Sequence, residues 1–142
     1  MNKLTRSDIR EKVMQSFYQV EFSIENNQDY DATLIALDVF HSDDFDKLPL
    51  FARELYVSIL DNYDNLKKIV SNNLVNWTFS RLDPLLISIS FTSLAEGIYL
   101  KKTPRKVVIN EGIKLAKKYC NKDDYRFINA LLDKAIEDYE CK

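Results

Sequence analysis

The chain contains very little glycine. Two glycines, Gly97 and Gly112, and three prolines occur among 142 residues. Glycine-rich phosphate loops such as GxGxxG and GxxxxGK[ST] cannot be written with these two glycines, so the common nucleotide-binding motifs are excluded. β-Sandwiches and barrels need many more turn residues, and the composition therefore favours helices.

Histidine is nearly as scarce, because His41 is the only one. A single histidine in a polar loop supports neither a Ser–His–Asp nor a Cys–His arrangement. The acidic residues that follow it, Asp43, Asp44 and Asp46, lack the glycine and the distal glutamate of an EF-hand loop. We therefore expect no catalytic residue, metal site, cofactor or small-molecule substrate, and hence no enzyme.

Long apolar runs are absent as well. No run approaches the roughly 18 to 20 residues that span a bilayer, and residues 1–6 lack the apolar segment of a secretory signal. We expect a cytoplasmic protein without membrane contact. In that compartment the two cysteines, Cys120 and Cys141, are expected to be free thiols rather than a disulfide.

Charge is present in quantity but is unevenly distributed. The net charge is −2, yet residues 21–46 hold eight acidic side chains and no lysine or arginine. Residues 101–126 hold nine basic side chains against three acidic ones. A molecule polarised in this way can bind a polyanion on one side. The alternative is that the lysine-rich helix faces are simply solvated.

Apolar residues recur at helical spacing. The length and an apolar content of 46% suit one domain over residues 1–142. A first helix is predicted to begin at Thr5, whose hydroxyl forms a capping box with Asp8. Ile9, Val13 and Phe17 then share one face of that helix.

Further helices follow from the same spacing. We predict a shorter helix within 30–40 and a polar loop at 41–46. From Pro49 the pattern fits one bent helix or two in tandem, because residues 61–65 form helix poorly. A short apolar element is expected at 74–77.

Two prolines mark helix starts in the second half. Asp83–Pro84 and Thr103–Pro104 each place a capping side chain before a proline at the first helical position. The first opens 85–99, which is apolar nearly all round and is expected to be the central buried helix. Its segment 85–89 also fits a strand locally, but the length and the cap favour a helix. With a last helix over 127–136, the sequence predicts an all-α bundle of about seven helices.

Tyr18 is the aromatic residue that does not fit the apolar stripe. It follows Phe17, and thereby leaves the apolar face of the first helix on the side of Arg6 and Arg10. An exposed aromatic ring beside basic side chains is typical of binding to single-stranded RNA. The alternative is that Tyr18 lies at the edge of the core.

Four segments resemble the NusB family. Residues 6–19 (RSDIREKVMQSFYQ) resemble its R-E-x-x-x-Q-x-L-Y-Q motif, and residues 76–82 (NWTFSRL) resemble N-W-x-x-x-R-L. Residues 104–119 (PRKVVINEGIKLAKKY) are similar to P-x-K-V-A-I-N-E-A-V-E-L-A-K-x-Y, and residues 126–134 (RFINALLDK) to K-F-V-N-G-V-L-D-K. The segments keep their usual order over essentially the whole chain.

This resemblance implies a compact helical bundle and a function. NusB proteins pair with NusE, a protein of the small ribosomal subunit, and bind boxA RNA in support of transcription antitermination. The expected partners are therefore boxA-like RNA, NusE and the transcription elongation complex.

The resemblance and the basic segments together give candidate site residues. Arg6, Arg10 and Tyr18 match RNA-facing positions of the family, and Asp123 matches an acidic position near the RNA and partner surface. Glu96 matches a glutamate that faces NusE. The predicted RNA-binding set is Lys3, Arg6, Arg10, Tyr18, Lys102, Arg105, Lys106, Lys122, Asp123 and Arg126, and the predicted partner-binding pair is Glu96 and Tyr99.

The chain also departs from the family pattern. Ser7 and Asp8 stand where many relatives have arginine, and each missing arginine removes a potential phosphate contact. The segment 85–96 has lost two arginines and an aspartate but keeps Glu96. That carboxylate is expected either at an edge within reach of a partner's cation or in an internal pair. The alternative function is a protein-interaction or rRNA-processing module that has lost most of its RNA affinity.

Overall fold

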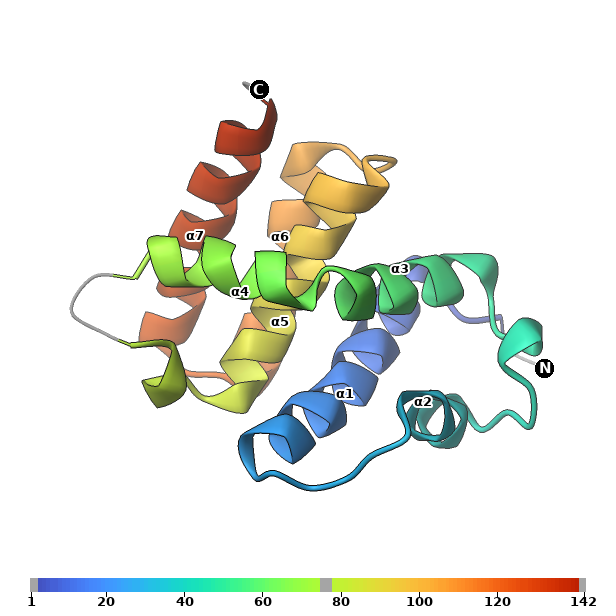
Figure 1. Cartoon of the computed structure of the whole chain (residues 1–142). Helices are drawn as coiled ribbons and strands as arrows, with labels where there is room; N and C mark the ends of the chain where they lie inside the picture. The colour runs from blue at the N-terminus through green and yellow to red at the C-terminus, as the bar shows by residue number, and fades with distance from the viewer. Residues whose placement is uncertain (1–2, 75–77, 141–142) are drawn as a thin grey trace.

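The structure, a computed structural model, describes residues 3–74 and 78–140, and every regular element in these ranges is helical (Figure 1). The α-helices are α1 (Arg6–Glu25), α2 (Ala32–Phe40), α3 (Leu50–Asp61), α4 (Tyr63–Asn72), α5 (Pro84–Leu94), α6 (Arg105–Tyr119) and α7 (Lys122–Glu140). Two short 3-10 turns are η1 (Phe45–Lys47) and η2 (Phe79–Arg81), and a π-helical turn, η3 (Ala95–Leu100), continues α5. The predicted all-α bundle is confirmed. None of the helices described is both long and apolar enough to cross a membrane.

The first predicted helix start is confirmed in detail. The Thr5 hydroxyl accepts the Asp8 amide at 3.0 Å, and the Asp8 carboxylate accepts the Thr5 amide at 2.9 Å. At the start of α5 the Asp83 carboxylate accepts the Leu85 amide at 2.8 Å, with Pro84 in the first turn. Both caps satisfy amide groups that a helix leaves without an internal partner.

The predicted cap at Thr103 is wrong. Helix α6 begins at Arg105 after Pro104, and no side chain caps it. The Thr103 hydroxyl instead donates to the carboxylate of Glu96 at 2.7 Å. A buried carboxylate needs hydrogen-bond donors more than a helix end near solvent does, and it therefore takes this hydroxyl.

The region after Pro49 consists of two helices in tandem, so the alternative of one bent helix is excluded. Asn62, with φ −112° and ψ 21°, separates α3 from α4. The two run almost end to end across the front of the bundle in Figure 1. Leu74 packs against the core, whereas the rest of the predicted apolar element, residues 75–77, lies outside the described residues.

Helix α5 forms the centre of the core. All nine residues from 86 to 94 are buried, and Phe91 lies at the middle of an aromatic cluster. Its ring centroid is 5.4 Å from that of Phe17, 5.6 Å from Tyr63 and 6.1 Å from Phe79. The buried hydroxyls of Ser88, Ser90 and Thr92 donate to carbonyls one turn earlier in the same helix, so burial leaves them satisfied. The alternative of a strand at 85–89 is excluded.

Both glycines lie where helices approach closely. A Cβ on Gly112 of α6 would be 2.8 Å from Ser93 Oγ on α5 and 2.7 Å from a methyl of Leu132 on α7. A Cβ on Gly97 would be 2.9 Å from a methyl of Ile136 on α7. The scarce glycine therefore serves close helix packing in the second half of the chain.

Helix α2 lies at the periphery, beside α1 and far from α7 in Figure 1. Only Ala36 of its nine residues is buried. Ala32, Ile35 and Phe40 are partly buried against the core, and they fix which side of the helix faces inward.

Candidate nucleic-acid interface

Tyr18 lies in an open groove between α1, α2 and α6. We call it the Tyr18 groove, and its volume is about 660 Å³. Its lining residues are Lys12, Met14, Gln15, Tyr18, Gln19, Asp38, Val39, His41, Leu85 and Tyr119. Tyr18 is half-buried, and its ring centroid is 6.4 Å from that of Phe22. Both alternatives for Tyr18 therefore hold in part, because the ring lies at the edge of the core and also faces a polar groove.

The groove is closed on one side by contacts between α1 and α6. The Gln15 amide donates to the Tyr119 hydroxyl at 2.9 Å, and the Glu11 carboxylate accepts from that same hydroxyl and from Lys118 at 2.7 Å. Partial burial raises the pKa of Glu11, but hydrogen bonds from Lys118 and Tyr119 outweigh it, so this pKa lies below its ordinary value. Glu11 is therefore ionised at neutral pH and holds one lysine of α6 beside the groove.

Glutamines and lysines around Tyr18 were absent from the predicted site. Gln15 lies three residues before Tyr18 on α1, Gln19 is the residue after Tyr18, and Lys12 lies one turn before Gln15. Helical spacing could have identified them as a set, because Lys12, Gln15 and Gln19 follow one another at spacings of three and four. Tyr119 could not be found in this way, because it reaches the groove from another helix.

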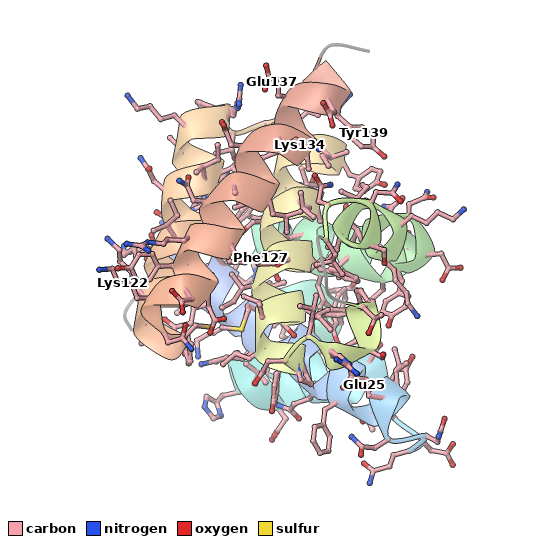
Figure 2. All side chains as sticks on the ribbon, turned by 90° about the vertical axis from the view of Figure 1, so that its left-hand side faces the viewer. Glu25, Lys122, Phe127, Lys134, Glu137 and Tyr139 are labelled. Carbon is pink, nitrogen blue, oxygen red and sulfur yellow. The ribbon has the colours of Figure 1, made fainter. Side chains whose placement is uncertain are left out.

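The predicted RNA-binding residues do not form one cluster. Exposed in the structure are Lys3, Arg6, Lys102, Lys106, Lys122, Asp123 and Arg126. Arg105 and Lys106 begin α6, whereas Lys122 begins α7 just beyond the other end of α6, about 22 Å along the helix axis. Figure 2 shows Lys122 at the lower end of α7, with Lys134 and Glu137 near its upper end. Basic side chains thus follow the length of the α6–α7 pair.

Arg6 and Lys102 are brought together from distant parts of the chain. Both line a small groove of about 180 Å³ with Phe51, Glu54 and Thr103. The Arg6 guanidinium lies 4.2 Å from the centre of the Phe51 ring, and Lys102 Nζ is 3.1 Å from a Glu54 carboxylate oxygen. This second basic area is about 18 Å from Tyr18 along the axis of α1.

The Arg105 side chain already binds groups of its own chain. Its guanidinium donates to the backbone carbonyl of Asp133 at 2.9 Å and forms an ion pair with the Asp133 carboxylate. A Glu137 oxygen lies 4.0 Å away. Arg105 is therefore less available to a phosphate than its neighbour Lys106, for which the described residues provide no ion pair.

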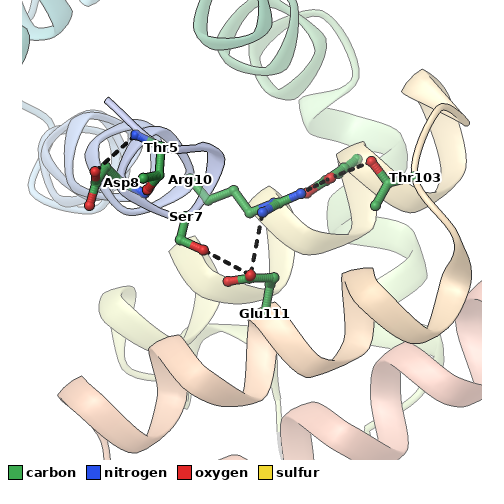
Figure 3. A network of polar contacts seen from close by, with 7 residues as sticks. Thr5, Ser7, Asp8, Arg10, Thr103 and Glu111 are labelled. Carbon is green, nitrogen blue, oxygen red and sulfur yellow. Dashed lines mark hydrogen bonds and ion pairs between the residues drawn. The ribbon is translucent and has the colours of Figure 1, made fainter. Parts of the chain in front are cut away.

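The prediction that Arg10 faces RNA is wrong, because this side chain is only 5% exposed. Arg10 Nε lies 2.7 Å from Glu96 Oε1, and Nη2 lies 2.8 Å from Oε2, a bidentate pair. A Glu111 oxygen, which also accepts the Ser7 hydroxyl at 2.8 Å, is 3.5 Å from Arg10 Nη1 (Figure 3). Burial lowers the pKa of Arg10, but Glu96 and Glu111 raise it overall, so the guanidinium stays charged.

Glu96 is correspondingly not at an exposed edge. It is 1% exposed, and it accepts the Arg10 guanidinium and the Thr103 hydroxyl. The expectation of a carboxylate open to a partner's cation is therefore wrong, and the alternative of an internal pair is confirmed. The Arg10–Glu96 pair joins α1 to the π-helical turn η3. The Thr103 hydroxyl, just before α6, also binds Glu96 and so connects the start of α6 to this pair.

Tyr99, the other predicted partner-binding residue, is half-buried at the side of η3. Burial raises the pKa of its hydroxyl, as does Tyr139 on α7, whereas a hydrogen bond to Asn65 on α4 opposes this. Its role toward a partner stays a prediction.

The other reactive side chains to consider are the metal-ligating residues and the cysteine thiols. No group of histidine, cysteine, aspartate and glutamate within the described ranges is placed to hold a metal ion. The Cys120 thiol is half-buried, and burial raises its pKa to about 11, which keeps it protonated. Cys141 lies outside the described residues.

The described residues offer open grooves with polar and aromatic linings to other molecules. These features define a small helical binding module.

Comparisons with known proteins identify the family of helical proteins to which the chain belongs. The sequence model of the NusB family matches residues 7–137. The transcription antitermination protein NusB of Bacillus licheniformis is 33% identical over 138 residues, covering 96% of this chain and 100% of its own length. T. maritima NusB, at 24% identity, has the same fold with a TM-score of 0.82, over 97% of this chain and 94% of its own. A chain in the crystal structure of antitermination factors NusB and NusE in complex with dsRNA is 18% identical, with a TM-score of 0.79 over 94% and 97%. The chain belongs to the NusB family.

Proposed function

We propose that this protein is a transcription antitermination factor that binds boxA-like RNA together with NusE, and so joins the transcription elongation complex in the cytoplasm. It acts by binding and carries out no catalytic step. The names of its relatives support the antitermination role, and the NusB–NusE–dsRNA structure, which contains a chain of this fold, supports the two partners.

The observation that carries the RNA proposal is the Tyr18 groove beside the basic residues of α6. An unstacked base can lie on the Tyr18 ring, and the amides of Gln15 and Gln19 can hydrogen-bond to base edges. Exposed lysines contact phosphates and release counterions. Lys114 and Lys117 lie on α6 between its two ends and continue the basic surface toward Lys122.

RNA binding by this chain alone is expected to be weak. Asp8 caps α1, and hydrogen bonds from Thr5 lower the pKa of its carboxyl group, so it carries a negative charge where relatives have arginine. Ser7 donates to Glu111 instead of facing a phosphate, and Arg10 is withdrawn into the interior. The exposed cations Lys3, Arg6, Lys102, Lys106, Lys122 and Arg126, with Asp123 among them, remain as the proposed surface.

The test measures binding of a labelled single-stranded boxA RNA by fluorescence anisotropy, with and without NusE. Tyr18→Ala should weaken binding about tenfold or more, the scale of one lost stacking contact. Tyr30→Ala, which removes another exposed ring outside the groove, is the matched control and should change little. Affinity should also fall steeply as salt is raised.

The second candidate, a protein-interaction module without RNA affinity, is favoured by Asp8 and by the buried Arg10. Calorimetric titration with NusE separates the two candidates. Tight NusE binding with no gain on adding boxA RNA would support the protein-interaction module. RNA binding that Tyr18→Ala leaves unchanged would place the RNA site elsewhere.

A further inference from the structure

Helix α2 presents a short stripe on which Leu34 is exposed and Leu37 is half-buried. Leu34, Leu37 and Asp38 lie at positions i, i+3 and i+4 and so share one face, and His41, the residue that follows the helix, lies at its end. The side chains that pack inward, Ala32, Ile35, Ala36 and Phe40, occupy the other face. Leu34 is 61% exposed, the largest value among the exposed large apolar side chains that the structure describes.

This stripe lines a groove of its own. We call it the Leu34 groove; it has a volume of about 730 Å³ and is lined by Leu34, Leu37, Asp38, His41, Ser42 and Asp43. It adjoins the Tyr18 groove through Asp38 and His41, but Leu34 and Leu37 belong to it alone. Two turns of α2, about 10 Å long, therefore offer apolar contact beside carboxylates.

The charge around the Leu34 groove is strongly negative. Asp31, Asp38, Asp43, Asp44 and Asp46 are exposed, and residues 21–46 contain no lysine or arginine. The nearest cations on adjoining segments are engaged: Lys47 pairs with Asp43 at 3.2 Å, and Lys12 lies 3.4 Å from the Val39 carbonyl. Phosphates would be repelled from this surface, so it does not suit RNA.

We infer that the Leu34 groove docks a basic amphipathic segment of a protein partner. Apolar side chains of such a segment would cover Leu34 and Leu37, and its lysines or arginines would lie against Asp38 and the aspartates at the two ends of α2. The geometry of two exposed helical turns fits a partner helix of similar length. The inference can be tested apart from the RNA proposal, because Leu34 and Leu37 line the Leu34 groove and not the Tyr18 groove, although the two grooves share Asp38 and His41.

The probe is a labelled amphipathic peptide made of leucine and lysine, titrated with the full chain and followed by anisotropy. Leu34→Ser and Asp38→Lys should each weaken its binding about tenfold, as expected for residues at the centre of a contact. Leu50→Ser and Asp64→Lys are matched controls: Leu50 is 60% exposed on α3, and Asp64 is exposed on α4. Each control should change the affinity less than about twofold.

Four further measurements decide the identity of the occupant. The same peptide with glutamate in place of lysine should not bind, and amide chemical shifts should change on α2 when the lysine peptide is added. Equal binding of both peptides, or shifts confined to other helices, would overturn the inference. So would boxA RNA that displaces the peptide from Leu34, or sedimentation that shows self-association lost in Leu34→Ser, because RNA or a second copy would then be the occupant. Unchanged melting of Leu34→Ser verifies that the variant is folded.

Discussion

Helices α5 and α2 are both rich in apolar residues, yet α5 is the most buried helix, whereas α2 lies at the surface and is only partly buried. Residues 86–94 of α5 are all buried, whereas Ala36 is the only buried residue of α2. The difference lies in the neighbours, because α5 is packed against α1, α3, α4, α6 and α7 and α2 mainly against α1. An apolar composition allows a helix to be buried. Whether the helix is buried depends on how many other helices pack around it.

Phe91→Ala on α5 should have the largest effect on stability. The ring is fully buried between Phe17, Tyr63 and Phe79, so its loss should lower the free energy of unfolding by about 3–5 kcal/mol. Leu34→Ala on α2 removes apolar carbons from an exposed site and should change the free energy of unfolding by less than about 0.5 kcal/mol. Urea unfolding of both variants gives the two values, and comparable losses would remove the contrast between the helices.

Arg10→Ala should rank next, because it leaves Glu96 buried without its cation. Removing one partner of a buried pair costs about 3–5 kcal/mol, and the Thr103 hydroxyl offsets part of this. Lys102→Ala breaks an exposed pair with Glu54 and should cost less than about 1 kcal/mol. Replacing Arg10 and Glu96 together by methionine should recover most of the loss. If the double variant is no more stable than Arg10→Ala, the buried pair is not the reason for the loss.

Glu21→Gln should stabilise the protein at neutral pH but not in acid. Burial raises the pKa of Glu21, opposed by the Tyr63 hydroxyl that donates to it at 2.7 Å, and Glu25 raises it further. The folded state therefore binds this proton more tightly than the unfolded state, and stability falls as pH rises from the ordinary carboxyl pKa through the raised one. Glutamine cannot ionise and escapes this loss. The melting temperatures of the unsubstituted protein and of Glu21→Gln should be measured from about pH 4 to pH 8, and the advantage of the variant should grow as pH rises. Parallel curves would show that Glu21 has an ordinary pKa.

The smallest predicted effect concerns the end of α2. His41 ends this helix in the left-handed region with φ 54°, a conformation that glycine adopts without steric cost. His41→Gly should therefore raise the free energy of unfolding by up to about 1 kcal/mol. Asn27, with φ 52°, is the comparison, since asparagine tolerates this region and Asn27→Gly should gain less. A gain from His41→Ala as large as that from His41→Gly would exclude backbone strain as the cause.

Much of the fold could be predicted, because the signals for it are local. The Thr5–Asp8 capping box and the Asp83–Pro84 start involve side chains within three residues of the amides they satisfy. The burial of α5 followed from the same kind of pattern. The helix start after Pro104 was also predicted correctly, but the Thr103 cap failed because a distant carboxylate, Glu96, accepts the hydroxyl.

The site was harder to predict because its residues meet only in the folded chain. Arg10 and Glu96 are 86 positions apart, and a family resemblance assigned each of them to a surface. Exposed basic residues such as Arg6 and Lys122 were placed correctly on the surface, but the Tyr119 contribution to the Tyr18 groove comes from a helix remote in sequence. For α2, the sequence predicted a shorter helix within 30–40 but not which of its sides is exposed, because that depends on the helices beside it.

The π-helical turn η3 sets a rule for how this chain can change in length during evolution. The amide of Lys101 donates to the Glu96 carbonyl five residues earlier, so the turn holds one residue more than a regular α-helical turn. Deleting one residue within residues 97–100 would let this turn close as a regular α-helical turn, so the helix can absorb the loss locally. The same deletion within α5 would rotate the residues that follow by about 100° and turn buried side chains away from the core. The chain should therefore tolerate the loss of a residue better in η3 than in the central helix before it.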